Sequence, residues 1–435
     1  MATLKAVRGT RDLVPPETEL WNRIEATARR VFARYNFGEI RTPIFENTAL
    51  FARSVGEETD IVSKEMYTWE DRARAQSEKT QSLTLRPENT AGVVRAYIEH
   101  GLGESGQLQK LYYIGPQFRR ERPQKGRYRQ FWQIGAEVIG PQSSGSESPL
   151  RDAEVLEMLA ALLQELGITG WTLELNSVGS SADRAKYNDV LRAALADVAP
   201  KMCGDCQRRA VTNPLRVLDC KVPEDQPIIE SLPKIGDSLG DDSKTHFAAV
   251  LAALEAAGVP YTLNQRLVRG LDYYTRTTFE FTHGGLGAQN ALLGGGRYDG
   301  LSEAIGGPKA PGIGFAMGLD RLVLTLQAQE ATQAGAQPAA KADAYIAPIG
   351  ENLNAAALVV ARELRRAGLR VELGDGSFRL KKSFEAADKI ARRIVILGED
   401  EHQSGILTVK DFISGKQTKV PRAELAAYLA RPAGE

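Results

Sequence analysis

A segment of small and polar residues, QAQEATQAGAQPAAKA, constrains the fold of this chain more than any other feature. It covers residues 327 to 342 and has the composition of a linker. With 435 residues, the chain is long enough for two or three domains. We therefore expect a first domain over residues 1 to 326, a linker over 327 to 342 and a second domain over 343 to 435.

The expected first domain mixes one long helix with many short strands. Residues 17 to 36 place apolar side chains at helical spacing. The β-like runs, among them LYYIGPQFRRE and RYRQFWQIGAEVIG, are separated mostly by turn-rich loops or isolated helices. This pattern favours an antiparallel sheet with helices packed on it, an α+β fold. A helix-rich block over about residues 178 to 262 interrupts the strands, and we interpret it as an insertion.

The expected second domain alternates strands and helices. YIAPI, LRVEL and RIVILG read as strands, and two helical segments separate them. A βαβαβ alternation predicts an α/β domain. Residues 341 to 435 hold 16 Lys and Arg against 13 Asp and Glu, so this domain is mildly basic.

Composition excludes several classes of protein. Lys plus Arg equals Asp plus Glu at 55 each, so no global field attracts nucleic acid, and any such partner must be held by local patches. The longest apolar run, residues 247 to 254, is far too short to span a bilayer, so we expect no membrane partner. The first residues contain no apolar stretch typical of a secretory signal, and three cysteines make no disulfide framework. We therefore expect a cytoplasmic protein.

The densest charge lies in RRERPQKGRYR, residues 119 to 129, between two strand-like runs. A hairpin there would bring several guanidinium groups to one face because alternate residues of a strand point the same way. Guanidinium groups suit phosphate oxygens, since they bind bidentately and stay charged. The alternative is a solvated basic hairpin tip, which the extension of the arginines into the strands makes less favoured.

Three further segments carry candidate site residues. LVRGLDYYTRTTFEF, residues 267 to 281, crowds polar side chains just before a strand. ALLGGGRYDGL, residues 291 to 301, contains a glycine run that could let a backbone approach a ligand, although by itself a tight turn is the simpler interpretation. GIGFAMGLDRL, residues 312 to 322, has Met317 where a dinucleotide-binding motif needs its third glycine, which leaves a nicotinamide site unsupported.

The sequence predicts no metal centre. The four histidines lie far apart, and no protease-type histidine pair is present. Cys203, Cys206 and Cys220 offer three thiolates without an obvious fourth ligand, whereas a structural zinc ion normally takes four. We therefore expect free thiols and no zinc.

Taken in order, these segments resemble the class II histidyl-tRNA synthetases over nearly the whole chain. RGTRDLVPPE, TLRPENT, LVRGLDYY and GGGRYDGL are similar to signatures of that family. FGEIRTPIFE, FRRERPQKGRYRQFWQIGAE and GIGFAMGLDRL are similar to its motifs 1, 2 and 3. The resemblance implies a class II catalytic domain with a helical insertion, followed by an anticodon-binding α/β domain.

The resemblance also implies a reaction and a set of roles. Histidine and ATP, supplied with Mg²⁺, would give histidyl-adenylate and pyrophosphate, and the histidyl group would pass to the terminal adenosine of histidine tRNA. Arg119 and Arg269 would act at the α-phosphate as the catalytic residues. The family pattern assigns ATP binding to Arg119, Arg127 and Arg321, and histidine binding to Glu88, Thr90, Gln133, Glu137, Arg269, Tyr274 and Tyr298.

Two interfaces follow from the same resemblance. Arg122, Gln124 and Lys125 in the motif 2 loop would reach the acceptor end of the tRNA. Pro43 of motif 1 would lie in the interface of a homodimer.

Two other functional classes use this fold. One is a regulatory subunit of ATP phosphoribosyltransferase, which typically lacks the anticodon domain and degrades the arginine signatures. The other is a sensor of uncharged tRNA, which has no need for a complete set of phosphate-binding residues. This chain keeps both the anticodon domain and the arginine signatures, which favours the enzyme.

Overall fold

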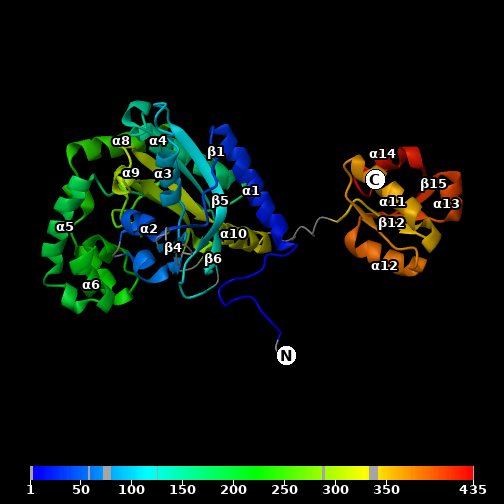
Figure 1. Cartoon of the computed structure of the whole chain (residues 1–435), viewed down its shortest axis with the longest axis horizontal. Helices are drawn as coiled ribbons and strands as arrows, with labels where there is room; N and C mark the ends of the chain where they lie inside the picture. Colours follow the sequence, from blue (N-terminus) through cyan, green and yellow to red (C-terminus); the bar gives the residue numbers. More distant parts are fainter. Residues whose placement is uncertain are drawn as a thin grey trace. The chain divides into compact units, whose positions relative to one another are not determined.

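We describe a computed structural model of the chain over residues 3–56, 59–71, 80–124, 126–286, 290–332 and 341–434. The chain divides into two compact units, Met1–Ala334 and Gly335–Glu435 (Figure 1). Helix α10, Leu319–Thr332, continues through residues 327 to 332 and buries Leu322 and Leu326 in the core of the first unit. The predicted linker therefore begins too early, because small and polar residues also suit the exposed last turns of an amphipathic helix.

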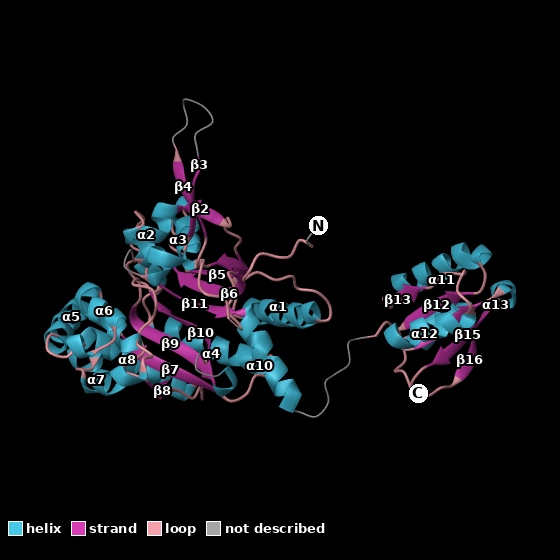
Figure 2. Ribbon diagram, turned by 90° about the horizontal axis from the view of Figure 1, so that it is seen from below, coloured by secondary structure: helices cyan, strands magenta, loops and turns pink. Residues whose placement is uncertain are grey.

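The first unit is built on an eight-stranded sheet with the order β1-β5-β6-β11-β10-β9-β7-β8 (Figure 2). The six central strands are antiparallel, as predicted, while β1 and β8 pair in parallel with their neighbours at the two edges. The strands are β1 Gly38–Glu39, β5 Gln109–Phe118, β6 Gln130–Ile139, β7 Trp171–Ser177, β8 Thr262–Leu263, β9 Thr275–His283, β10 Ala291–Arg297 and β11 Gly312–Gly318.

Four helices contribute to the hydrophobic core on one face of this sheet. They are α1 Glu17–Arg34, α4 Pro149–Glu165, α8 Asp241–Ala256 and α10. Strand β6 shows how the two faces differ: Ile134, Ala136 and Val138 join this core, so Gln133 and Glu137 point to the opposite face. Strand alternation thus separates an apolar face from a polar one, and the polar face carries the candidate site.

A three-stranded sheet, ordered β2-β4-β3, joins the polar side of the first unit. Its strands are β2 Phe45–Asn47, β3 Tyr67–Asp71 and β4 Gln81–Leu85, and the neighbouring helices are α2 Thr48–Val55, a π-helix Ile61–Glu65, α3 Thr90–Glu99 and α9 Leu301–Ala304. The guanidinium of Arg86 donates to the carbonyl oxygens of Thr42 at 3.0 Å and Pro43 at 3.3 Å. Thr42 and Pro43 therefore lie outside the strand, which begins at Phe45, because Arg86 takes up their carbonyl groups.

The inserted block has a hydrophobic core of its own. Tyr187, Leu191, Cys206, Val217 and Ile229 are buried in it. Its principal elements are α5 Ser181–Leu195, α6 Gly204–Thr212, the 3₁₀ helices η4 Pro214–Asp219 and η5 Pro223–Asp225, and α7 Gln226–Ser231. These helices group together beside the main sheet (Figure 2). Helix α8 instead belongs to the main core, so the predicted insertion of about 178 to 262 extends too far.

The second unit has a five-stranded sheet with the order β13-β12-β14-β15-β16. Strands β13, β12 and β14 are parallel, as the predicted βαβαβ alternation requires, whereas β15 and β16 add an antiparallel hairpin. The elements are β12 Ala344–Pro348, α11 Asn354–Arg366, β13 Val371–Leu373, α12 Leu380–Ile390, β14 Arg393–Leu397, α13 Glu399–Ser404, β15 Ile406–Asp411, β16 Gln417–Pro421 and α14 Leu425–Leu429.

Among the helices of both units that the structure describes, none is long and apolar enough to cross a membrane.

Candidate active site

The polar face of the main sheet forms one wall of a cavity of about 620 Å³. The predicted site residues that line it are Glu88, Thr90, Arg119, Arg127, Gln133, Arg269, Tyr274 and Arg321. Arg119 follows β5 and Arg269 precedes β9, 150 positions later in the sequence, so only the tertiary structure brings them to one cavity. A single cavity therefore holds all four of the predicted arginines together with oxygen acceptors.

The basic hairpin forms, but its arginines lie outside the paired strands. Strand β5 ends at Phe118, β6 begins at Gln130, and the amide of Arg119 donates to the carbonyl oxygen of Arg129 at 2.9 Å. Nε of Arg119 donates to the carbonyl oxygen of Pro87 at 2.9 Å. Its guanidinium lies 5.2 Å from the ring centre of Phe131. Arg119 is thereby fixed in place by two neighbouring segments of the chain.

The other residues of the hairpin go to different places. Arg127 lines the cavity and pairs with Glu121 at 3.1 Å. Arg129 turns away and donates to the carbonyl oxygen of Arg8 at 3.2 Å, so the predicted common face holds Arg119 and Arg127 but not Arg129. Arg122 and Gln124 are exposed and are not part of the cavity wall, and Lys125 lies outside the described residues.

The glycine run belongs to strand β10, so its interpretation as a tight turn is wrong. A Cβ atom on Gly294 would lie 2.5 Å from Nη2 of Arg269, and one on Gly296 would lie 2.8 Å from Cδ1 of Tyr274. Arg269 also forms an ion pair with Glu280 of the adjacent strand β9. The absence of side chains on β10 thus makes room for Arg269 and Tyr274 against the sheet. At the start of the same strand, the carbonyl oxygen of Ala291 accepts a hydrogen bond from Arg321.

Glu88 also lines the cavity, at the N-terminus of α3. Its Oε2 accepts the amide of Thr90 at 2.7 Å, and its Oε1 accepts the amide of Ala91 at 3.1 Å. Burial raises the pKa of Glu88, and the two amide donors oppose that rise. Each carboxylate oxygen keeps a second lone pair, so Glu88 can still accept from a ligand.

Glu137 is fully buried behind the cavity wall. Its two oxygens accept hydrogen bonds from Thr90 Oγ1 and from the Tyr298 hydroxyl, both at 2.7 Å. Burial raises the pKa of Glu137 to about 8. Of these three residues only Thr90 lines the cavity, so Glu137 and Tyr298 reach it through Thr90. On β11, Gly314 is required beside Glu137, because a Cβ there would overlap Oε2.

Arg297 supports this wall from below and is fully buried. It pairs with Asp152 of α4 at 2.5 Å and with Asp299, and it donates to the carbonyl oxygen of Ser146 at 2.6 Å. His246 of α8 contacts the second oxygen of Asp152 at 2.9 Å. The buried arginine therefore ties the end of β10, and with it the neighbouring Tyr298, to the helices on the far face of the sheet.

Sequence reasoning missed several residues of the cavity wall. Tyr113 on β5 and Glu280 on β9 line it. In a strand, every second residue points to the same face. Counting in steps of two along β5 and β9 could therefore have identified Tyr113 and Glu280 as residues of the polar face. Glu65 and Arg216 also line the cavity, but they come from the π-helix and from η4 in the insertion, so no local pattern indicates them.

Gln133 has an orphaned polar atom. It lies on β6 and lines the cavity, and no described residue donates a hydrogen bond to its buried Oε1. A buried acceptor without a partner is costly, so a ligand donor at this place would relieve a real penalty.

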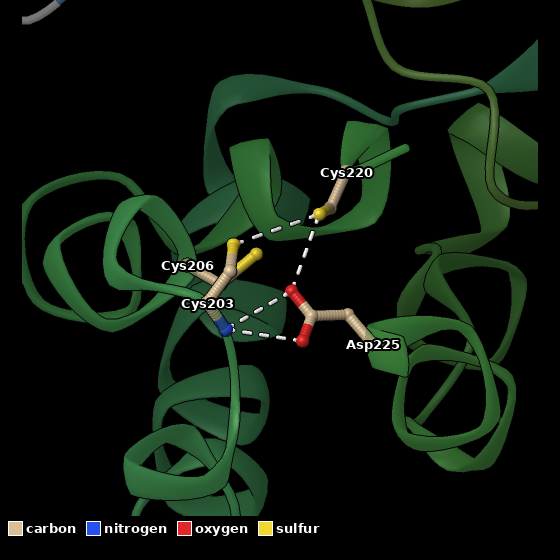
Figure 3. Close-up of side chains that lie close together, drawn as sticks. All are labelled: Cys203, Cys206, Cys220 and Asp225. Atoms are coloured by element: carbon tan, nitrogen blue, oxygen red, sulfur yellow. Dashed lines mark hydrogen bonds between the residues drawn. The ribbon is translucent and has the colours of Figure 1, made fainter. Parts of the chain in front are cut away.

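Outside the cavity wall, the structure brings together one group of residues able to hold a metal ion. Among the described residues, Cys203, Cys206, Cys220 and Asp225 place their ligand atoms within 4.8 Å of one another (Figure 3). The prediction of no zinc assumed that a fourth ligand is missing, and Asp225 overturns that premise.

Comparisons with known proteins agree along the whole chain. The family model described as Histidyl-tRNA synthetase matches residues 9–322, and that of an Anticodon binding domain matches residues 343–431. The histidine–tRNA ligase of Koribacter versatilis (strain Ellin345) is 74% identical over 98% of this chain and 96% of its own length. That of Solibacter usitatus (strain Ellin6076) is 55% identical, over 98% and 99% respectively.

The solved structures give the same result. The apo histidyl-tRNA synthetase of S. aureus superposes with a TM-score of 0.79 at 36% identity, covering 99% of this chain and all of its own. A Bacillus halodurans structure, described as an ATP phosphoribosyltransferase regulatory subunit/histidyl-tRNA synthetase, has a TM-score of 0.64 at 19% identity over 92% of this chain and 99% of its own, and it supports the fold alone. From the family match, the identities and the cavity together, we conclude that the chain belongs to the histidyl-tRNA synthetase family.

Proposed function

We propose that the chain activates L-histidine with ATP to give histidyl-adenylate and pyrophosphate, and then transfers the histidyl group to the 3′-terminal adenosine of histidine tRNA. The observation that carries this proposal is one cavity that holds five arginines, the four predicted ones and Arg216, together with a set of buried oxygen acceptors. The arginines match a triphosphate, and the acceptors match an α-ammonium group and an imidazole.

At the phosphate end, Arg119 and Arg269 bind the α-phosphate from two sides. Arg127 and Arg321 bind the outer phosphates and the adenine region. ATP enters as its Mg²⁺ complex, because Mg²⁺ binds substrate phosphates. Arg269 takes the place that a metal ion occupies in related synthetases, and its pairing with Glu280 holds the guanidinium in position before substrate arrives.

At the histidine end, acceptors recognise the amino acid. Glu88, Thr90 and Gln133 bind the α-ammonium group, and the unpartnered Oε1 of Gln133 is available for one of its protons. Tyr274 on the cavity wall satisfies one imidazole nitrogen, and Glu137, held by Tyr298, acts on the other through Thr90, which lies between it and the cavity. A carboxyl group with a pKa near 8 changes charge in the same range as imidazole, so the two can share a proton at neutral pH.

The reaction needs no protein nucleophile. The histidine carboxylate attacks the α-phosphorus, a bond to that carboxylate oxygen forms, and the bond to the leaving pyrophosphate breaks in line with it. Preorganised cations stabilise the charge that develops on the phosphoryl oxygens, and such stabilisation supplies most of the rate enhancement in many enzymes. Positioning the two substrates side by side lowers the remaining barrier.

Transfer to tRNA uses both units. We assign anticodon recognition to residues 343 to 435, whose match to the anticodon-binding family supports this role. Arg122 and Gln124 are exposed beyond the cavity, and with Lys125 we assign them to the acceptor end. Arginine and glutamine side chains suit base edges.

We further propose a homodimer with Pro43 in its interface. Pro43 is exposed, and it is followed by the apolar side chains of Ile44 and Phe45, which are 44% and 52% exposed. Trp69, 40% exposed, lies with its ring centre 6.1 Å from that of Phe45. Large apolar side chains that gather at one exposed place are typical of an interaction surface.

Histidine-dependent exchange of pyrophosphate into ATP tests the proposal. The enzyme supports exchange only when histidine is present, and a regulatory subunit or a tRNA sensor supports none. If exchange is absent but tRNA binding is intact, the chain is a tRNA sensor rather than the enzyme. If both are absent, the regulatory subunit is favoured.

A further inference from the structure

The four residues of the cysteine cluster come from consecutive elements of the inserted block (Figure 3). Cys203 is the N-cap residue of α6 and Cys206 lies in the first turn of that helix. Cys220 follows η4, and Asp225 is the last residue of η5. Two thiols one helical turn apart, joined by ligands from a following loop, form the usual arrangement of a small structural metal site.

The distances within the cluster match those of a tetrahedral site. Sγ of Cys203 and Sγ of Cys220 are 3.9 Å apart, and Sγ of Cys220 is 3.3 Å from Oδ2 of Asp225. Zinc–sulfur bonds of about 2.3 Å at tetrahedral angles separate two sulfurs by about 3.8 Å. One ion could therefore bind all four atoms with little movement of the chain.

Burial makes the cluster unfavourable without a cation. The side chains of Cys206, Cys220 and Asp225 are all buried, and Asp225 is only 1% exposed. Within the described part of the inserted block, the aspartate ion pairs are formed by Asp189, Asp205 and Asp219 rather than by Asp225. A buried carboxylate without a counter-charge is costly. Three thiols can form only one disulfide, which would leave that carboxylate without a counter-charge.

Hydrogen bonds already orient the ligands. The amide of Cys203 donates to both oxygens of Asp225, at 3.0 and 3.2 Å. The amide of Val222 donates to Sγ of Cys220 at 3.4 Å. Outer hydrogen bonds of this kind fix ligand direction in metal sites.

We propose that Cys203, Cys206, Cys220 and Asp225 bind one zinc ion, which fastens the inserted block. Thiolates are soft ligands and, with a carboxylate oxygen as the fourth donor, they favour zinc over the hard cations Mg²⁺ and Ca²⁺. The ion joins α6, η4 and η5, which also pack together in the small core of the insertion.

The fastened segment also contacts the active site. Between the second and third cysteines, Asn213 donates to Asp272 at 2.9 Å, and Arg216 donates to the carbonyl oxygen of Arg269 at 3.0 Å. Asp219 and Lys221, on either side of Cys220, line the catalytic cavity. The zinc ion therefore positions the loop that carries Arg269, without touching substrate.

Metal analysis of the full-length chain tests the site. Protein purified without chelators should contain one zinc ion per chain, measured by inductively coupled plasma mass spectrometry. Replacement of zinc by cobalt should give the near-ultraviolet thiolate band and the visible bands of tetrahedral cobalt. A chain that takes up neither metal, or that contains a Cys203–Cys220 disulfide under reducing conditions, overturns the proposal.

Two variants test the ligands. Cys203→Ser should fold, because serine is a favourable N-cap residue for α6, yet it should bind zinc at least about tenfold more weakly. Asp225→Asn should weaken zinc by a similar factor and shift the cobalt bands. The matched control is Asp205→Asn. Asp205 lies in helix α6, and its carboxylate pairs with Arg208 outside the cluster. Unaltered zinc affinity in both ligand variants contradicts the assignment.

The positioning role has its own readout. Removal of zinc should raise the KM for ATP and histidine in pyrophosphate exchange several-fold, with a smaller change in kcat, and added zinc should restore it. Because zinc content is measured separately, failure of the exchange assay itself leaves the metal site to be judged by the metal analysis alone. Unchanged KM values after complete zinc loss overturn the positioning role.

Discussion

At the scale of single residues, the site depends on polar groups buried against their solvation preference. Glu137 is fully buried, and its two oxygens are occupied by Thr90 and Tyr298. Arg269 is held between Glu280 and a strand without side chains. Because these groups are fixed before substrate binds, their removal should affect recognition and rate in different ways.

Glu137→Gln tests the buried carboxyl. The pKa of Glu137 in the folded chain, about 8, exceeds its ordinary value, so the folded state keeps a proton that the unfolded state releases. This stabilising contribution is complete at low pH and is lost as pH rises from about 5 to 8. The melting temperature of the variant, relative to that of the native chain, should therefore rise over this range in calorimetry.

The same variant should raise the KM for histidine about tenfold or more, because the single carbonyl oxygen of Gln cannot replace both oxygens that accept from Thr90 and Tyr298 behind the cavity wall. Glu174→Gln on β7, outside the cavity wall, serves as the control. If the melting temperatures of variant and native chain changed in parallel with pH, Glu137 would not have the raised pKa. An unchanged KM for histidine would show that Glu137 takes no part in histidine recognition.

Arg269→Ala tests the α-phosphate contact. Loss of one preorganised donor at the reacting group should lower the rate of adenylate formation about 100-fold or more. Binding of tRNA should change little, because Arg269 lies in the catalytic cavity. Single-turnover adenylate formation and tRNA filter binding measure the two effects. Arg266→Ala, three positions earlier and paired with Glu230, is the control, and equal losses in both assays would contradict the role.

At the scale of elements, strand β10 determines whether Arg269 and Tyr274 can occupy their places beside the sheet. Gly294 and Gly296 face Arg269 and Tyr274, and Gly295 lies against β11, where a Cβ would overlap the carbonyl oxygen of Gly314. Glycine normally weakens a strand. Here the absence of side chains leaves room for Arg269, the proposed catalytic arginine, and for Tyr274.

Gly294→Ala should reduce adenylate formation at least about tenfold while leaving the fold intact. The added methyl group meets the guanidinium of Arg269 rather than backbone, so the arginine must move. Pyrophosphate exchange and circular dichroism check the two statements. Gly284→Ala, where no atom lies within 4 Å of the new Cβ, is the control. Native activity in Gly294→Ala would show that Arg269 tolerates displacement.

At the scale of the whole molecule, the chain forms two units with separate cores, and we assign different steps of the proposed reaction to them. The first unit contains the entire cavity, and the second closes its own core around the five-stranded sheet. Activation of histidine and recognition of tRNA should therefore be separable by truncation. The surface of the proposed dimer also belongs to the first unit, and it lies beside Pro43, whose carbonyl group is held by Arg86.

Deletion of residues 341 to 435 tests this division. The truncated chain should keep part of its histidine-dependent pyrophosphate exchange, since the cavity is complete without the second unit. Charging of histidine tRNA should fall about 100-fold or more, measured with radiolabelled histidine. Full retention of charging would refute the assignment of tRNA recognition to this unit.

Phe45→Glu tests the proposed dimer. A charge within the exposed apolar group formed by Ile44, Phe45 and Trp69 should convert a dimer into monomers in analytical ultracentrifugation. Val190→Glu, on an exposed position of α5 in the insertion, is the control. A native chain that is monomeric, or a variant that remains dimeric, would place the interface elsewhere.

Much of the candidate site could be predicted from the sequence because its residues lie in local motifs. Arg119 and Arg127 belong to one charged hairpin, and Arg269 and Tyr274 belong to one segment. Strand periodicity correctly indicated the antiparallel sheet. The boundaries were less accurate: α10 extends beyond residue 326, and α8 packs in the main core rather than in the insertion. Both errors arise because packing partners distant in sequence decide where a helix belongs.

The amino-acid sequence alone determined the family, the order of the elements and most of the charged groups, since each depends on residues close together along the chain. Only the tertiary structure decided which groups meet. It placed Arg119 and Arg269 at one cavity, gave Arg269 room beside the glycines of β10, and placed Asp225 beside three cysteines. The physical reason is that a cavity or a metal site is closed by segments whose separation in sequence carries no information about their distance in space.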